Sequence, residues 1–335
     1  MAPSADQVEQ DSDRPLDQLV AAHAGTDDSV PTTPTRGIGI VDYKTPLVDV
    51  ELEVREPQTG EVQIALVSAG VGLWDVEEAE GTVPLPLPKA LGWQGAGTIE
   101  KVGDGVDGLS VGDAVLAYAP MGGFLAERVT VPAAMVTPAP QRVPLTDAGA
   151  LLIGAATAYQ ALVDIGQLKR GQKVLITAAA GGTGAFAVEL AKHLGAYVIG
   201  TAGPDNHEFL RELGIDEVYD YNADAVAAIR DRHPDGVDLL VDNVSAESFS
   251  VHAALVRKGG IALGTHEPNP EAPEGVTGQL VASWERPASF AAVVKLIDDG
   301  VLNLRIRRRF SLSEAEQALE HLRGKHGRGA VLVEI

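Results

Sequence analysis

The segment from Gln172 to Gly203 constrains the fold of this 335-residue chain more than any other. It begins with a short apolar run, Lys173–Thr177, which has β-branched residues and no polar alternation. Such a run is typical of a parallel strand that is covered on both faces. A glycine turn follows, then apolar residues at helical spacing, and then a second apolar run at Tyr197–Gly200. This order of strand, glycine turn, helix and strand predicts the first half of a dinucleotide-binding fold.

The turn reads Ala179-x-Gly181-x-x-Gly184, an alanine variant of the G-x-G-x-x-G pattern. Gly181, with Gly182 and Thr183 beside it, lets the backbone approach a phosphate, and Gly184 lets the helix pack closely on the sheet. The free N–H groups at the start of that helix would face a pyrophosphate. A flavodoxin-like turn without a ligand is the alternative, but the register of the flanking strands favours a nucleotide site.

The end of the second strand bears on which nucleotide is bound. An NAD-preferring site places an acidic residue there to hold the ribose 2′-hydroxyl, whereas this chain has Thr201 and Ala202. The missing carboxylate favours NADP. NAD stays as the less favoured alternative, because Asp205 follows closely and could supply a carboxylate to the ribose. The candidate phosphate contacts are His207, Arg211 and Tyr221. For each of them, a solvated surface residue is an equally good interpretation.

The composition excludes several classes of function. A formal net charge of −21 argues against nucleic acid or an anionic membrane as a partner. The chain has no cysteine, which excludes disulfides, thiolate catalysis and thiolate-bound zinc. The histidines show no ligand spacing, and His193 is simply a polar position on the first predicted helix. No apolar stretch is long enough to span a bilayer and no signal-peptide pattern is present, so we expect a cytoplasmic protein.

The composition of the chain and the spacing of its apolar residues change twice along its length. Residues 1–33 are rich in Asp, Ser, Thr, Pro and Gln, which predicts a mostly disordered tail. The following hundred or so residues form short apolar runs between Gly, Pro and Asp turns, which predicts a compact barrel or sandwich. The expected strands of this part are Val48–Val54, Val62–Val67, Gly97–Val102 and Ala114–Tyr118.

The βαβ pattern then runs from about Gln167 to Thr265. Its further strands are predicted at Glu217–Tyr219, Val237–Val241 and Gly260–Leu263. Beyond it the pattern predicts a helix at Phe290–Ile297, a strand at Arg305–Phe310, a helix at Leu312–Leu322 and a last strand at Ala330–Ile335.

Three blocks of the sequence, in this order and spacing, resemble the medium-chain dehydrogenase/reductase superfamily: Ala69–Asp75, Leu91–Tyr118 and Val174–Gly203. The likeness is to its zinc-free branch of quinone oxidoreductases and enoyl reductases. It implies an α/β chain with a GroES-like β-barrel domain at residues 34–153 and 287–335. A Rossmann domain with a doubly wound parallel sheet, at residues 154–286, would be inserted between them, with the active site in the cleft. The family also implies a homodimer that pairs edge strands near Gly278–Ser283.

Two positions depart from the zinc-dependent relatives. Gly72 stands where they have a cysteine, and their Gly-His-Glu element reads Gly92-Trp93-Gln94 here. Neither Gly72 nor Trp93 can coordinate zinc, so we expect no metal. The zinc-free branch usually has an asparagine at the position of Gly72, which makes Gly72 and Trp74 candidate residues of an altered catalytic pocket. Asp75 matches a structural aspartate.

The run Glu77, Glu78 and Glu80 is interpreted as a solvated helix face rather than an acid/base pair. Tyr118 is the best candidate for the proton donor, and a packed barrel tyrosine is the alternative of equal weight. The resemblance implies further cofactor contacts at Thr157, at the strand ends Asn243, Gly264 and Thr265, and at the basic residues Lys325 and Arg328.

Together these features predict an NADPH-dependent, zinc-free enzyme that transfers hydride to a small conjugated carbonyl compound. Quinones, enones, enals and enoyl thioesters form the expected substrate class. One alternative is a nicotinamide-nucleotide-binding protein with little turnover, and another is a reductase dedicated to one biosynthetic step. A cleft lined by Trp74 and Trp93 would favour an enzyme, whereas a cleft filled by Trp93 would favour the binding protein.

Overall fold

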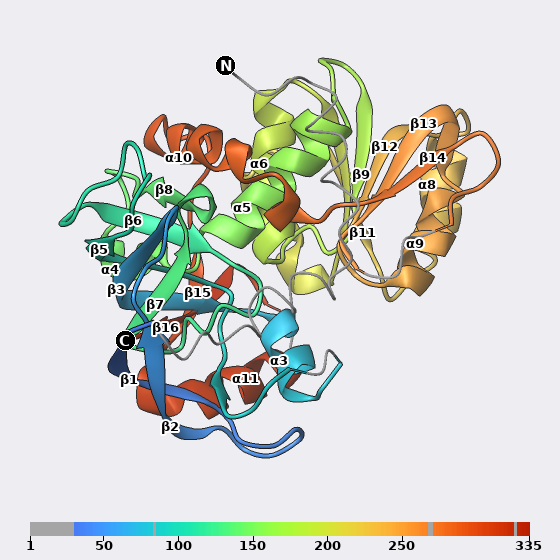
Figure 1. Cartoon of the computed structure of the whole chain (residues 1–335). Coiled ribbons are helices and arrows are strands. Elements are labelled where there is room, and N and C mark those ends of the chain that lie inside the picture. Colours follow the sequence, from blue (N-terminus) through green and yellow to red (C-terminus); the bar gives the residue numbers. More distant parts are fainter. Residues whose placement is uncertain (1–29, 83–84, 267–270, 325–326) are drawn as a thin grey trace.

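The computed structural model describes residues 30–82, 85–266, 271–324 and 327–335. One half of the molecule is a β-barrel, and the other half is a parallel sheet with helices on both faces (Figure 1). The α/β fold expected from the sequence, a GroES-like part joined to a Rossmann-like sheet, is therefore confirmed.

The barrel is built on a seven-stranded sheet in the order β15-β16-β3-β5-β6-β8, with β7 paired to β3. Its central strand β3 is flanked by β16, which comes from the C-terminal end of the chain, with Val331 opposite Val71. Segments from both ends of the chain thus form one barrel. The strands are β3 (Glu61–Val71), β5 (Gln94–Val102), β6 (Ala114–Tyr118), β7 (Arg128–Pro132), β8 (Val136–Pro138), β15 (Ile306–Ser311) and β16 (Ala330–Glu334).

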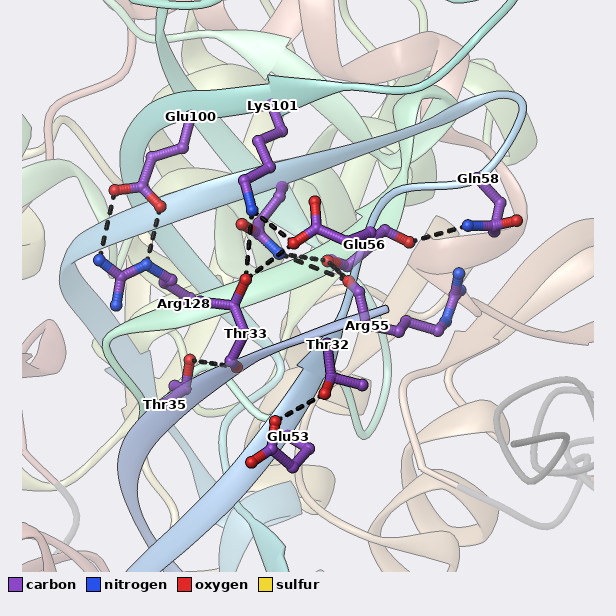
Figure 2. Close-up of polar contacts among 12 residues, drawn as sticks. Thr32, Thr33, Thr35, Glu53, Arg55, Glu56, Gln58, Glu100, Lys101 and Arg128 are labelled. Atoms are coloured by element: carbon purple, nitrogen blue, oxygen red, sulfur yellow. Dashed lines mark hydrogen bonds and ion pairs between the residues drawn. The ribbon is translucent and has the colours of Figure 1, made fainter. Parts of the chain in front are cut away.

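A smaller sheet in the order β2-β1-β4 packs on the barrel, with β1 (Thr32–Ile40), β2 (Val48–Arg55) and β4 (Lys89–Ala90). Polar side chains tie its strands to the barrel (Figure 2). Thr33 and Lys101 both donate to Glu56. Thr32 and Thr33, expected in the tail, therefore lie in β1, because their hydroxyls and backbone are used in the sheet. Residues 1–29 of the expected tail lie outside the described residues.

The second half is a six-stranded sheet in the order β11-β10-β9-β12-β13-β14, in which every neighbouring pair is parallel. Val174, Leu175 and Ile176 of the central β9 are completely buried, which explains why this strand shows no polar alternation. The strands are β9 (Lys173–Ile176), β10 (Tyr197–Ala202), β11 (Glu217–Asp220), β12 (Val237–Asp242), β13 (Val256–Gly264) and β14 (Thr277–Leu280).

Helices cover both faces of this sheet. In Figure 1, α5 (Leu152–Tyr159) and α6 (Gly182–His193) lie between the barrel and the sheet, while α8 (Ala225–Arg232) and α9 (Ala246–Ala253) cover the other face. One hydrophobic core joins the two halves, since Leu116 of the barrel and Ile176 of the sheet belong to the same buried cluster. The remaining helices are α3 (Leu73–Ala79), α4 (Leu145–Ala148), α7 (His207–Glu212), α10 (Phe290–Asp298) and α11 (Ala315–Gly324).

The predicted elements of the βαβ part are confirmed within a few residues, and Ala114–Tyr118 has the predicted bounds. The helix predicted at Leu312–Leu322 is in fact a 3₁₀ turn, Leu312–Glu314, followed by α11. The 3₁₀ turn begins at the predicted residue because the side chains of Ser311 and Glu314 form a capping box there. Within the described ranges, the helices are too short or too polar to cross a lipid bilayer.

Candidate active site

The glycine turn connects β9 to α6 at the carboxyl edge of the parallel sheet. Gly181 is the N-cap of α6 and has no side-chain cap of its own. A Cβ on Gly184 would lie 2.3 Å from the carbonyl oxygen of Ala178, so only glycine permits this close packing. A Cβ on Gly182, in contrast, would meet only the carbonyl oxygen of Gly329, at 3.9 Å. The helix start beside Gly182 and Thr183 therefore has the open backbone that a phosphate site requires.

Ala179 joins this turn to the next strand, because its N–H donates to the carbonyl oxygen of Thr201 (3.0 Å). Ala178 adopts a φ of 46°, in the region that favours glycine. Backbone hydrogen bonds thus connect the turn to β10 and close it between Gly181 and Ala178.

The ends of β9 and β12 are linked by a buried polar network. The carboxylate of Asp242 accepts from Thr177 Oγ1 (3.0 Å) and from Ser248 Oγ (2.6 Å). Asn243 donates its backbone N–H to Thr177 Oγ1 (2.9 Å) and its side-chain amide to the carbonyl oxygen of Thr177 (3.0 Å). Its Oδ1 atom is buried and has no hydrogen-bond partner among the described residues. That acceptor fits a ligand that brings its own donor.

Gly264 and Thr265 lie beside this network, since the N–H of Thr265 donates to the carbonyl oxygen of Asp242 (3.0 Å). The structure thus brings together three of the predicted strand-end residues: Asn243, Gly264 and Thr265.

The loop after β10 gathers several of the predicted phosphate contacts. His207 Nε2 lies 3.1 Å from the carbonyl oxygen of Ala202, and Tyr221 is 60% exposed with its hydroxyl close to Gly203. Arg328 reaches this loop from the C-terminal segment and donates to Asn206 Oδ1 (2.9 Å) and to the carbonyl oxygen of Asp205. Lys325 lies outside the described residues.

The ring of Phe209 packs against two arginines, Arg328 and Arg305. This residue was not identified from the sequence. The guanidinium groups of Arg328 and Arg305 lie 5.2 Å and 5.5 Å from the centre of its ring. Arg211, on α7, instead lines a shallow cavity of about 340 Å³. The other side of this cavity is formed by Glu217 and Tyr219 of the edge strand β11.

Tyr118 is only 1% exposed and stacks on Phe290, with 6.0 Å between ring centres. Burial raises the pKa of its phenol, which keeps the hydroxyl protonated. Ser283 Oγ donates to this hydroxyl (3.2 Å) and accepts from Thr157 Oγ1 (3.0 Å). Two predicted site residues, Thr157 and Tyr118, are therefore joined by a serine that the sequence analysis did not identify.

Gln160 holds the segment that carries Ser283. Its amide nitrogen donates to the carbonyl oxygens of Ser283 (3.0 Å) and Arg286 (3.1 Å) and to Ser289 Oγ (2.9 Å). Gln160 begins a π-helical segment, Gln160–Ile165, that continues α5. The glutamine in the run Ala155–Leu162 was the one available signal, because a buried amide must find partners.

Gly72 and Trp74 share one space at the start of α3. A Cβ on Gly72 would lie 2.3–2.5 Å from atoms of the Trp74 ring, so the indole takes the place of any side chain at position 72. The chain has three tryptophans, and all of them meet here. The ring centre of Trp93 lies 6.4 Å from that of Trp74 and 6.3 Å from that of Trp284. We call these three residues the tryptophan cluster.

The interpretation of the acidic run on α3 as a solvated face is wrong for Glu78. Glu77 and Glu80 are exposed, but Glu78 is only 3% exposed and forms an ion pair with Lys89. Its Oε2 atom also accepts from Trp93 Nε1 (2.5 Å). The reason is helical periodicity, which places Glu78 one turn after Asp75, on the face of α3 that packs against the barrel.

Asp75 has the structural role expected for it. Its buried carboxylate accepts from the N–H of Gly72 (2.8 Å) and of Gly92 (3.1 Å). Burial raises the pKa of this carboxyl well above its usual range, and these two hydrogen bonds oppose the shift.

A catalytic zinc does not fit this site. Gly72 has no donor atom, and the indole N–H of Trp93 is a donor that Glu78 already uses. Across the part of the chain that the structure describes, no three His, Asp or Glu side chains are grouped so that they could hold a metal ion.

Two family models match the chain. The alcohol dehydrogenase GroES-like domain matches residues 58–141, and the zinc-binding dehydrogenase domain matches residues 213–333. The polyketide synthase GfsB of Streptomyces halstedii is 31% identical over 314 residues, which make up 89% of this chain and 5% of that protein. The chain therefore spans only a small part of this much longer relative.

Other relatives are closer in length. A probable quinone oxidoreductase of Leishmania amazonensis is 34% identical over 230 residues, 65% of this chain and 66% of that protein. The crystal structure of CurK enoyl reductase has the same fold, with a TM-score of 0.80 at 22% identity, over 90% of this chain and 99% of that one. With its barrel, its parallel sheet and these matches, the chain belongs to the medium-chain dehydrogenase/reductase superfamily of oxidoreductases.

Proposed function

We propose that this chain is an NADPH-dependent, zinc-independent reductase that transfers hydride to a conjugated carbonyl acceptor. The acceptor class comprises quinones, enones, enals and enoyl thioesters. The relatives named quinone oxidoreductase and enoyl reductase support this reaction type. The observation that carries the proposal is the contact of Arg328, from the segment before β16, with the loop after β10, a strand that ends without a carboxylate.

The preference for NADPH follows from the charges around this loop. Thr201 and Ala202 end β10, so nothing at the strand end repels a 2′-phosphate. Arg328 offers a guanidinium, and the exposed hydroxyl of Tyr221 lies beside Gly203. An arginine fork is well suited to bind a phosphate with two parallel hydrogen bonds. In this proposal His207 completes the phosphate contacts.

The remaining residues fit the rest of the nucleotide. Gly181, Gly182 and the start of α6 would hold the pyrophosphate through backbone N–H groups. Asn243, Gly264, Thr265 and Thr157 would line the nicotinamide end. When bound, the nicotinamide supplies the hydride.

Reduction of a conjugated carbonyl builds negative charge on its oxygen, which a hydrogen-bond donor must stabilise. Tyr118 is our proposed donor. Its hydroxyl accepts a hydrogen bond from Ser283, which leaves its own proton free to donate. Because burial raises the pKa of this phenol, Tyr118 acts as a neutral donor and not as a base.

A second function is favoured by a specific observation. Tyr118 is almost completely buried, and the tryptophans contact one another around the space of Gly72. This packing favours a nicotinamide-nucleotide-binding protein with little turnover. The match to part of a polyketide synthase favours the dedicated biosynthetic reductase instead, with an enoyl thioester as its acceptor.

The test is oxidation of NADPH and of NADH by the purified protein with a panel of quinones, enals, enones and enoyl thioesters. Turnover that is faster with NADPH supports the reductase. Binding of NADPH without reduction of any acceptor would replace it with the binding protein.

We also propose a homodimer. β14 is the last strand in the order of the parallel sheet, and Thr277, Gly278 and Gln279 are exposed there. Pairing of two such edges would extend the sheet across two subunits. Light scattering measures the mass directly.

A further inference from the structure

We propose that Glu78 is a positioning residue that sets acceptor specificity by fixing the indole of Trp93 within the tryptophan cluster. The acceptors selected in this way are planar ones, whose conjugated carbonyl is attached to an aromatic ring. The reaction assumed for these acceptors rests on the proposed reductase function. The role of Glu78 is argued from the geometry of the cluster alone.

Two buried carboxylates on one face of α3 hold the segment that carries Trp93. Asp75 accepts from the N–H of Gly92, and Glu78 binds Lys89 and Trp93. Lys89 donates in addition to the carbonyl oxygen of Met121 (3.0 Å). The backbone before Trp93 and the far end of its indole are therefore fixed from the same helix.

The backbone at Gly92 leaves little freedom for the ring. Gly92 has a φ of 102°, and a Cβ there would lie 2.7 Å from the backbone nitrogen of Leu125. The adjacent indole then has its N–H committed to a charged acceptor, which makes a short and strong hydrogen bond. Trp93 is thus a fixed platform and not a mobile surface ring.

Trp93 lies between the other two tryptophans. Its plane is tilted by 39° to that of Trp74 and stands at 81° to that of Trp284. Trp74 comes from α3, whereas Trp284 comes from the turn Ser283–Glu285, whose first residue contacts Tyr118. Aromatic faces held in this way favour a flat ring over a flexible alkyl chain, through offset stacking and edge-to-face contacts.

Three variants test the role of Glu78 without leaving a buried charge unpaired. Replacing Glu78 alone would leave the Lys89 ammonium buried without its partner, which destabilises folds. The double variant Glu78→Leu/Lys89→Met removes the whole pair and with it the acceptor for Trp93, and such apolar replacements are usually tolerated. Trp93→Phe keeps a ring but loses the N–H. Glu77→Gln is the matched control, because Glu77 is an exposed carboxylate on the same helix.

Binding is measured by calorimetry with benzylacetone, the phenyl-substituted ketone that lacks the double bond of benzalacetone, and with an alkyl methyl ketone of equal carbon number. Turnover is measured with benzalacetone and the corresponding alkyl enone. We expect the unmodified protein to prefer the phenyl-substituted compound by about threefold to tenfold, the range of one aromatic contact. The preference should fall toward one in the double variant and in Trp93→Phe, through KM rather than kcat. It should persist in Glu77→Gln.

The two arms separate the two proposals. If no acceptor of the panel is reduced, benzalacetone included, but the preference for benzylacetone is present and is lost in the variants, the reductase is wrong and the role of Glu78 stands. If both enones are reduced and the folded variants keep the original preference, the role of Glu78 is wrong. A protein without any preference for benzylacetone would likewise overturn the inference about Glu78.

Discussion

A Cβ atom on Gly72 would lie 2.3 Å from the nearest ring atom of Trp74, so these two residues occupy a single space between them. A substitution at one of these positions should therefore change the effect on stability of a substitution at the other. The indole of Trp74 thus occupies the space in which the resemblance to the zinc-free branch implies an asparagine side chain.

Gly72→Asn should destabilise the fold by about 1–3 kcal/mol, because the new side chain overpacks against the indole. Adding Trp74→Ala should recover most of that loss, so the double variant should be more stable than the sum of the two single effects. Urea unfolding of the wild type, the two single variants and the double variant measures this coupling. Gly324→Ala is the control, since a Cβ there meets nothing within 4 Å. Purely additive effects would mean that Trp74 does not fill the space.

The two ends of the glycine turn should separate binding from folding. Gly184→Ala should lower stability strongly, because its Cβ would lie 2.3 Å from the carbonyl oxygen of Ala178. Gly181→Val should cost less stability, since its Cβ would be 3.2 Å from that oxygen, but should abolish NADPH binding. Energy transfer from the tryptophan cluster to NADPH reports binding, and urea unfolding reports stability. Normal NADPH binding by a folded Gly181→Val protein would move the phosphate site elsewhere.

Arg328→Gln should weaken NADPH binding by about tenfold to a hundredfold and leave NADH binding nearly unchanged, because only NADPH carries the 2′-phosphate. Calorimetry with each nucleotide measures the difference. Arg323→Gln serves as the comparison, since Arg323 contacts Glu80 and Glu316 instead. An equal loss of affinity for both nucleotides would show that Arg328 only supports the loop after β10.

Stability should depend on pH through Glu217. Burial alone would raise the pKa of this carboxyl, but hydrogen bonds from Tyr197, Tyr219 and His233 lower it to about 2. A carboxyl whose pKa is lower in the folded state stabilises the fold above its unfolded pKa, near 4.5, and loses that contribution as the pH falls toward 2. The difference in unfolding free energy between wild type and Glu217→Gln should therefore shrink steadily between pH 5 and about pH 2. Glu212→Gln, an exposed neighbour, should show no such trend.

Local patterns predicted the nucleotide half of the fold well. The strand, turn, helix and strand from β9 to β10 depend on apolar runs and on glycines that are adjacent in the sequence, and these signals survive without tertiary context. Thr32 and Thr33, the first two residues of β1, were assigned to the tail because they continue its Thr- and Pro-rich composition. The pairing of β1 with β2 is a contact between distant residues that no local pattern contains.

The site divides in the same way. Gly181, Gly182 and Gly184 could be identified because the chemistry of the turn is written in consecutive residues. Ser283 could not, since it gains its role only when the segment after β14 returns across Thr157 and Tyr118. Glu78 was misread because charge runs on short helices usually face solvent. Only the position of α3 against the barrel shows which of the three carboxylates is buried.

The pairing of β16 with β3 has a consequence for how the molecule is made. On the ribosome, β3 emerges early, yet its neighbour β16 follows only after the entire parallel sheet has been synthesised. Until then the Ser68–Val71 part of one edge of β3 is open to pairing with other chains, because β7 pairs only with Glu61–Ala65. The parallel sheet can assemble during this wait, whereas the barrel closes only when β16 arrives. Translation of β16, and not of the parallel sheet, therefore completes the barrel.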